Sequence, residues 1–168
     1  MIGGSIDLAA PLSTGGRLVT LIQVHHTGGS ELRTPAQVEQ DALGRDGKGF
    51  TEDPYTVHVW RGSDVGELGV NPWRISWGRD PARKPAGAEG DNAHAVAVVV
   101  HGDYSRGPLP VWARDRLVEA LVWACRSLGV GADAVRGHRE LPGEATLCPG
   151  FDMDEIRALL AAALASAP

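Results

Sequence analysis

The chain has 168 residues and a formal net charge of −5. This length suits a single domain over residues 1–168 that buries its own core. The acidic balance argues against nucleic-acid partners and against binding to an anionic membrane, because both need clustered lysine and arginine. No apolar run approaches the length of a membrane span, and residues 1–11 lack the features of a secretory signal. We therefore expect a monomer that is made in the cytoplasm without a signal peptide and is not inserted in a membrane.

Apolar patterning and turn residues divide the chain into short elements. Runs of β-branched or alternating residues predict strands, whereas an apolar period of about 3.6 residues between proline and glycine predicts helices. In chain order we expect a strand at 17–24, a helix at 35–43, a strand at 54–60, a turn at 62–66, extended pieces at 68–70 and 73–77, a strand at 93–100, and helices at 111–128 and 154–165. This order predicts the α/β class, with one mixed central sheet flanked by helices.

Three segments carry more specific expectations. Alternation in the second strand places Tyr55, Val57 and Val59 on one face. Residues 79–92 are rich in proline, glycine and charge, so we expect a surface loop there. The uncharged run at 93–100 predicts a central strand that is covered on both faces.

The two cysteines lie in different surroundings. A pair of cysteines in a chain of this size does not make a disulfide framework. Cys125 lies on the apolar stripe of the helix at 111–128, so we expect it to be a core thiol. Cys148 precedes Pro149 and Gly150 in a loop, where a reactive or metal-binding thiol is expected.

Two segments far apart in the sequence, one with His25 and His26 and one with His138 and Cys148, together suggest a metal site. His25 and His26 end the first strand, and because neighbouring strand residues face opposite ways, only one of them should point into a cleft. His138 and Cys148 share a loop punctuated by glycine and proline. One imidazole of the pair, a second imidazole and a thiolate form a three-ligand set suited to zinc, with one coordination position left for water.

Two other interpretations of these residues stay open at this point. The histidine and cysteine of the loop could share it by chance. A structural zinc site is the second alternative, but it would need a fourth protein ligand and no CxxC motif is present. The candidates for that ligand are His26, His94, His101 and Asp152. The three histidines within the predicted strands are expected to be structural, namely His58, His94 and His101.

The chain resembles the zinc-dependent N-acetylmuramoyl-L-alanine amidases, a family that includes phage endolysins, bacterial cell-wall amidases and animal peptidoglycan recognition proteins. The resemblance spans residues 18–150 and rests on four segments in family order. They are His25-His26-Thr27, the Asp-Pro-Tyr strand over 53–59, Asn92 with its apolar strand and Gly102-Asp103, and Gly137-His138-Arg139-Glu140 followed by Thr146-Leu147-Cys148-Pro149-Gly150. The last of these motifs is the most specific.

The resemblance implies a function and a role for each site residue. His25, His138 and Cys148 would hold Zn²⁺ at one edge of a cleft. Tyr55 and Thr146 map onto catalytic positions: Tyr55 would donate to the oxyanion or orient water, and Thr146 would reach the oxyanion or shape its loop. The implied reaction is hydrolysis of the amide between N-acetylmuramic acid and L-alanine, with bacterial peptidoglycan or muropeptides as partner.

Departures from the family pattern concern the substrate. Trp77 is followed by Gly78 where many members have a histidine. The loop from His138 to Cys148 is two residues longer than in the recognition proteins and closer in length to the recycling amidases, which end it with aspartate. Trp73 and Trp77 are candidates for stacking on substrate or for the core. The basic residues of the loop at 79–92 either meet stem-peptide carboxylates or are simply solvated, namely Arg79, Arg83 and Lys84.

The resemblance allows three settings for the protein. The first is a wall-lytic endolysin, made in the cytoplasm and released to the cell wall through a membrane pore that another protein forms. A cytoplasmic muropeptide-recycling amidase would use the same chemistry in another place. A non-catalytic peptidoglycan-binding module is the competing class, but family members that only bind have typically lost the cysteine ligand, and Cys148 is present here.

Overall fold

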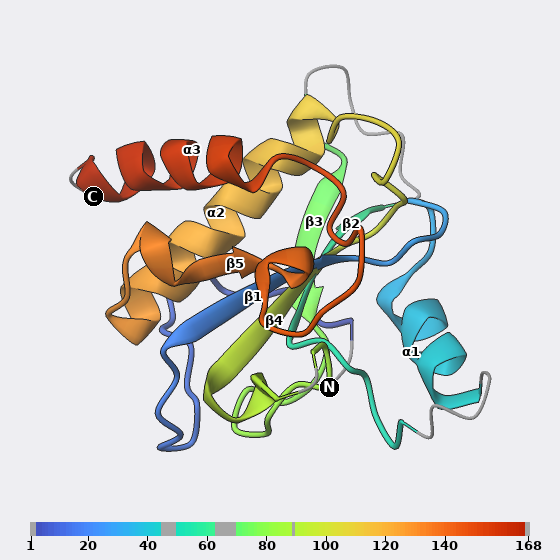
Figure 1. Cartoon of the computed structure of the whole chain (residues 1–168), viewed down its shortest axis with the longest axis horizontal. Helices are drawn as coiled ribbons and strands as arrows, with labels where there is room; N and C mark the ends of the chain where they lie inside the picture. The colour runs from blue at the N-terminus through green and yellow to red at the C-terminus, as the bar shows by residue number, and fades with distance from the viewer. Residues whose placement is uncertain (1–2, 45–49, 63–69, 89, 167–168) are drawn as a thin grey trace.

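The computed structural model describes residues 3–44, 50–62, 70–88 and 90–166. Within these ranges the chain forms a five-stranded sheet in the order β3-β2-β4-β1-β5 (Figure 1). The neighbours β1, β2, β4 and β5 pair in parallel, and β3 runs antiparallel to β2. The elements are β1 (Leu21–His26), α1 (Pro35–Gly44), β2 (Val57–Arg61), β3 (Trp73–Trp77), β4 (Ala95–Val100), α2 (Val111–Leu128), β5 (Val135–Gly137) and α3 (Met153–Ala165).

The main apolar core lies between the sheet and α2. Alternate residues of the central strands enter this core, as Val24, Val98 and Val57 show at paired positions of β1, β4 and β2. They meet the buried stripe of α2, which includes Leu117 and Leu121. Since successive strand residues face opposite ways, the residues between these valines lie on the other face of the sheet.

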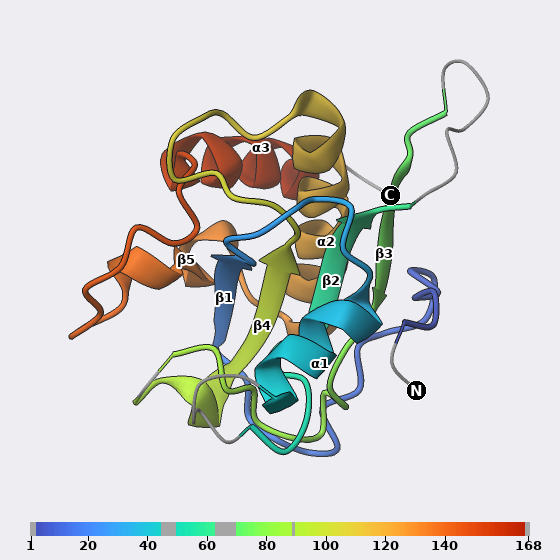
Figure 2. The ribbon, with the colours of Figure 1, turned by 90° about the vertical axis from the view of Figure 1, so that its right-hand side faces the viewer.

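The second face of the sheet carries the polar groups. Gln23, His25 and His58 are all buried there, and both histidines pair in register with Val99 of β4. Figure 2 shows α1 on this side of the sheet, whereas α2 and α3 lie on the opposite side. The sheet therefore separates an apolar layer from the layer that contains the candidate site residues.

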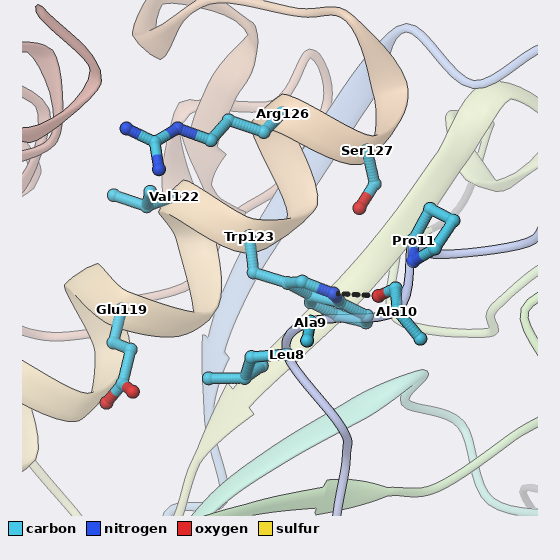
Figure 3. Close-up of a pocket in the computed structure, with 9 residues that line it drawn as sticks. All are labelled: Leu8, Ala9, Ala10, Pro11, Glu119, Val122, Trp123, Arg126 and Ser127. Carbon is cyan, nitrogen blue, oxygen red and sulfur yellow. Dashed lines mark hydrogen bonds between the residues drawn. The ribbon is translucent and has the colours of Figure 1, made fainter. Parts of the chain in front are cut away.

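The N-terminal segment packs against α2, away from those residues. The indole Nε1 of Trp123 donates a hydrogen bond to the carbonyl oxygen of Ala10 at 2.8 Å (Figure 3). A cavity of about 410 Å³ opens beside this contact, lined by α2 and residues 8–11. None of the predicted site residues lines it. The contact fastens the segment that precedes β1 to the apolar side of the fold.

The α/β class and the mixed sheet are as predicted, and most elements lie where they were expected. The helix over 111–128 has the predicted bounds, and Gly129 ends it in a left-handed conformation. Cys125 is buried in α2 as expected. The expected turn at 62–66 and the piece at 68–70 fall largely outside the described residues. Within the described ranges, no helix combines the length and the apolar character that a membrane crossing requires.

Two sequence predictions about strands were wrong. We did not predict β5, which has only three residues. Tyr55 was expected to share a face with Val57 and Val59, but β2 begins only at Val57. The two valines enter the core with α2, whereas the ring of Tyr55 lies beside His25 on the other side of the sheet. The reason is that the backbone turns at Asp53, whose carboxylate accepts the N–H of Tyr55, before the strand starts.

Candidate metal centre

Parallel pairing of β1 and β5 brings two of the predicted ligands together. Val24 of β1 pairs with Gly137 of β5. His25 follows Val24 and His138 follows Gly137, so the two histidines lie at the same edge of the sheet. Their rings lie 4.6 Å apart, measured between centroids. Of the adjacent pair, His25 is the residue that faces this site, because its side chain is buried against His138 and Tyr55. His26 points away, and its Nδ1 accepts the backbone N–H of Tyr104 at 3.1 Å.

The loop after β5 returns Cys148 to the same point. The backbone N–H of Arg139 donates to the carbonyl of Cys148 at 2.7 Å, which closes the loop immediately after His138. The thiol then lies 3.8 Å from Nδ1 of His25. The backbone N–H of His26 donates to the sulfur at 3.3 Å. Such a hydrogen bond stabilises a thiolate and aims it at the site.

His25, His138 and Cys148 form a group whose donor atoms all lie within 4.8 Å of one another. Tetrahedral zinc places neighbouring nitrogen and sulfur ligands roughly 3.3–3.6 Å apart, given Zn–N of about 2.0 Å and Zn–S of about 2.3 Å. The observed 3.8 Å between sulfur and Nδ1 is close to that spacing. Both the chemistry of the donors and their separation therefore fit zinc.

Burial sets the protonation states of these donors. Desolvation, helped by the neighbouring His138 and His26, lowers the pKa of His25 to about 3, so the imidazole is neutral at physiological pH, as a metal ligand must be. Desolvation also raises the pKa of the Cys148 thiol to about 11, although the N–H of His26 acts in the opposite direction. Without a cation Cys148 is a thiol, so binding of a metal must release its proton.

The residues considered as a fourth protein ligand have other partners. Among the residues that the structure describes, the three-residue group contains no further histidine, cysteine or carboxylate. His101 contacts the carbonyl of Arg33, and Nδ1 of His94 lies 3.4 Å from the carbonyl of Leu18. Asp152 caps the start of α3 by accepting backbone N–H groups. The described residues thus favour a three-ligand site over a closed structural one.

Tyr55 and Thr146 differ in their relation to this group. The ring of Tyr55 lies 5.4 Å from that of His25, measured between centroids. Burial is the main cause that raises the pKa of the Tyr55 phenol, so the hydroxyl keeps its proton and is a donor. The hydroxyl of Thr146 accepts the backbone N–H of Cys148 at 3.1 Å. This contact supports the loop-shaping alternative for Thr146.

A family model for N-acetylmuramoyl-L-alanine amidase matches residues 15–151. The chain belongs to the N-acetylmuramoyl-L-alanine amidase family. No curated protein sequence gave a match.

Several solved structures share the amidase fold. The endolysin N-acetylmuramoyl-L-alanine amidase LysCS from Clostridium intestinale URNW superposes with a TM-score of 0.66 at 21% identity, covering 94% of this chain and 92% of that one. The Ph2119 endolysin from a Thermus scotoductus MAT2119 bacteriophage gives 0.56 at 22%, with 86% of each chain covered. A variant of Drosophila PGRP-LB in complex with tracheal cytotoxin gives 0.63 at 17%, with 87% and 85% covered. At these identities the likeness concerns the fold.

One departure from the amidase pattern has a steric reason. A side chain at Gly78 would place its Cβ 2.6 Å from Nε2 of His58 and 2.5 Å from the carbonyl of Tyr55. His58 fills the space beside Gly78, so this chain has no room for the histidine that many family members carry after the tryptophan. Trp73 is buried, and Trp77 packs edge-on against Trp123. Both tryptophans therefore belong to the core side rather than to a stacking surface.

The basic loop at 79–92 is partly structural. Arg79 is 8% exposed, and its guanidinium donates to the carbonyls of Asp53 at 2.6 Å and Lys84 at 2.5 Å. It therefore fixes the segment that leads to Tyr55 and is not available to a substrate carboxylate. Arg83 is exposed and pairs with Glu52 at 2.8 Å.

An ion pair between the ligand loop and α3 escaped the sequence prediction. The carboxylate of Glu140 accepts the backbone N–H of Gly137 at 2.7 Å and two hydrogen bonds from Arg157 of α3, at 2.8 and 2.9 Å. The Arg157 hydrogen bonds lower the pKa of Glu140, so the carboxylate stays ionised. These contacts hold both sides of His138. The Gly-His-Arg-Glu motif contains Glu140, but nothing in the motif indicates its partner.

A second carboxylate lies beside the same ligand. Oε2 of Glu144 is 3.1 Å from Nε2 of His138. If Nδ1 of His138 binds the metal, a carboxylate beside Nε2 favours one orientation of the ring. Glu144 lies in the loop between His138 and Cys148.

A buried chain of polar side chains also escaped the sequence prediction. Oδ2 of Asp53 lies 2.8 Å from Nε2 of His58, Nδ1 of His58 lies 2.7 Å from Nε2 of His101, and Nδ1 of His101 lies 2.7 Å from the carbonyl of Arg33. The carbonyl can only accept, so His101 donates to it and accepts from His58. The remaining contact then requires a proton shared between His58 and Asp53. Asp53 also accepts the N–H of Tyr55, so this row of hydrogen-bonded side chains links Tyr55 to the segment just before α1.

The buried chain makes stability depend on pH. Burial, with the neighbouring His58 contributing, lowers the pKa of His101 to about 3. Below about pH 6.5 the unfolded chain binds a proton here that the native state does not, so the free energy of unfolding falls as pH falls. We expect wild type to lose roughly 2 kcal/mol more than His101→Gln between pH 7 and pH 5. Urea unfolding with a chelator present measures this, and His94→Gln is the control that should follow wild type. Equal losses in wild type and His101→Gln would contradict the assignment.

Removing the carboxylate of Glu140 should loosen the ligand loop. Glu140→Ala removes the acceptor of the Gly137 N–H and two of the hydrogen bonds of Arg157, which keeps its contacts with Val135 and Asp154; this should lower the free energy of unfolding by about 1–3 kcal/mol. Because His138 would lose its support, affinity for added zinc should fall about 10-fold or more. Asp154→Ala is the matched control, since Asp154 pairs with the same arginine but is 90% exposed. Urea unfolding and chelator-competition titration measure the two effects. A Glu140→Ala protein that binds zinc as tightly as wild type would show that the clamp does not orient His138.

Proposed function

We propose that the protein is a zinc-dependent N-acetylmuramoyl-L-alanine amidase that hydrolyses the amide between N-acetylmuramic acid and L-alanine in peptidoglycan. The observation that carries this proposal is the convergence of His25, His138 and Cys148 from β1, the end of β5 and the following loop, with donor atoms within 4.8 Å of one another. Membership of the amidase family supports the reaction type.

The side chains of the site suit this reaction. His25, His138 and Cys148 would hold Zn²⁺ and leave it one coordination position. When bound, Zn²⁺ supplies a Lewis acid that lowers the pKa of a water molecule from its bulk value toward ~7 and polarises the amide carbonyl. Tyr55 keeps its phenolic proton and lies beside His25, so it would donate a hydrogen bond to the negative oxygen that develops in the transition state. Thr146 would hold the backbone of Cys148.

Two observations favour peptidoglycan as the substrate and catalysis over binding alone. Structures with the same fold contain tracheal cytotoxin, both on Drosophila PGRP-LB and on the complex of the peptidoglycan recognition proteins LCa and LCx. The thiol of Cys148 completes the three-ligand group, and a module that only binds peptidoglycan has no need of it.

For the setting, we propose a wall-lytic endolysin over a recycling amidase. Similar folds occur in the LysCS endolysin and in the Ph2119 bacteriophage endolysin, each over most of its length. In this proposal the chain acts as a monomeric single domain. It would be made in the cytoplasm and reach the cell wall through a pore that another protein forms. The loop before Cys148 is closer in length to that of the cytoplasmic recycling amidases. A recycling amidase is therefore the second candidate.

The scissile bond can be identified by digesting purified peptidoglycan and analysing the products by mass spectrometry. We expect free stem peptides that begin with alanine, and their disappearance after chelation and recovery on adding zinc. Cys148→Ala should release none of them yet still sediment with the polymer. Full activity after exhaustive chelation would exclude the zinc mechanism. Intact glycan-peptide after incubation with zinc-loaded wild type would leave a peptidoglycan-binding module.

The role of Tyr55 can be separated from metal binding. Tyr55→Phe keeps the ring beside His25 but removes the proton donor, so turnover should fall roughly 10²–10³-fold while zinc affinity stays unchanged. Tyr104→Phe is the matched control, because Tyr104 is the other tyrosine of the chain and its hydroxyl donates to the carbonyl of His101. Release of stem peptides and chelator competition are the measurements. A Tyr55→Phe protein with wild-type turnover would return Tyr55 to a structural role.

A further inference from the structure

Gln23 is a buried polar residue on the face of β1 that carries His25. It lies two positions before His25, so both side chains leave the strand on the same side. Gln23 is 0% exposed, and among the described residues neither its Oε1 nor its Nε2 has a hydrogen-bond partner. Buried side-chain amides are nearly always hydrogen-bonded, so an unpartnered carboxamide at this depth needs a reason.

His25 presents the complementary unpartnered atom. Its Nδ1 faces the sulfur of Cys148 at 3.8 Å, so Nδ1 is the nitrogen available to a metal. Its Nε2 is buried and has no partner among the described residues. A neutral imidazole that binds a metal through one nitrogen carries its proton on the other. Nε2–H is therefore a buried donor that needs an acceptor.

The surroundings of Gly87 show that Nε2 of His25 and Oε1 of Gln23 lie on the same side of this glycine. A Cβ on Gly87 would lie 2.6 Å from Nε2 of His25 and 3.2 Å from Oε1 of Gln23. Both atoms therefore crowd the same side of Gly87. The backbone there is not left-handed, so these contacts alone require glycine. Gly87 lies in the loop at 79–92, whose Ala86 is tied to the carbonyl of Pro54.

We propose that Gln23 is the positioning residue for His25: Oε1 of Gln23 accepts the proton of His25 Nε2, directly or through one water molecule, and so fixes the tautomer that offers Nδ1 to the metal. The other two ligands have comparable outer contacts, Glu144 beside Nε2 of His138 and the N–H of His26 on the sulfur of Cys148. Gln23 completes this set. The proposal rests on the proposed zinc site.

The test compares zinc affinity with stability in the full chain. Gln23→Met keeps the approximate size and removes the acceptor, and Gln23→Glu restores an acceptor. Ile22→Val is the matched control, because Ile22 is the adjacent buried residue of β1 on the opposite, α2-facing side. We would measure the dissociation constant for zinc by chelator competition, and the Tm of each metal-free protein.

We expect Gln23→Met to bind zinc about 10–100-fold more weakly than wild type, with an unchanged or higher metal-free Tm. Gln23→Glu should recover most of the affinity, and Ile22→Val should lower the Tm without changing affinity. A Gln23→Met protein that binds zinc as tightly as wild type overturns the positioning role and leaves the zinc site intact. Absence of zinc binding by wild type overturns the proposed function itself, and the positioning role with it.

A second measurement needs no variant and so covers failure of Gln23→Met to fold. In zinc-loaded wild type labelled with ¹⁵N-histidine, the Nε2 proton of His25 should give a slowly exchanging signal, and Nδ1 should carry the metal-bound shift. A zinc-bound Nε2, or an Nε2 proton that exchanges as fast as that of the exposed His94, overturns the proposal.

Discussion

Parallel pairing on both sides of β1 is the constraint on which the site depends. Residues at the carboxyl ends of parallel strands gather at one edge of the sheet. In the register of β1 with β5, Val24 pairs with Gly137, so the residues that follow them, His25 and His138, lie side by side. The register with β4 puts Val99 between His25 and His58, so the site and the buried histidine chain share one layer. A slip of one residue in β1 would turn His25 toward α2 and bury a valine in its place. The apolar packing of β1 therefore also determines where the ligand points.

The layer that contains the site is polar and buried, and its residues avoid isolated charges in different ways. His25 and His101 are held neutral by burial, whereas Asp53 and His58 share one proton. Each group avoids an isolated buried charge, which a low-dielectric interior strongly disfavours. A cation that enters the group around His25 would meet two imidazoles and one thiol that must deprotonate. The thiolate of Cys148 and the carboxylate of Glu144 beside His138 would then balance part of the positive charge.

The sequence predicted what depends on long patterns and failed where structure depends on a single contact. Long apolar runs located β1, β4 and α2, and the order of the motifs indicated the amidase family. β5 escaped because three residues, one of them the exposed Arg136, show no periodicity. The side on which Tyr55 lies depends on one hydrogen bond to Asp53, which strand alternation does not encode. The partner of Glu140 depends on how α3 docks, and the surroundings of Gln23 depend on a distant loop, so neither was predictable from local sequence.

The clamp between Glu140 and Arg157 means that the working unit is longer than its motifs. The family match ends at residue 151, after the last ligand, yet the guanidinium that braces the ligand loop belongs to α3. α3 holds none of the three proposed metal ligands, but it also covers part of α2 and adds Ile156 and Leu160 to the core. A fusion that joined a wall-targeting module directly after residue 151 would keep His25, His138 and Cys148. It would lose Arg157, which holds Glu140 and the ligand loop in place. The junction in such a fusion belongs after α3.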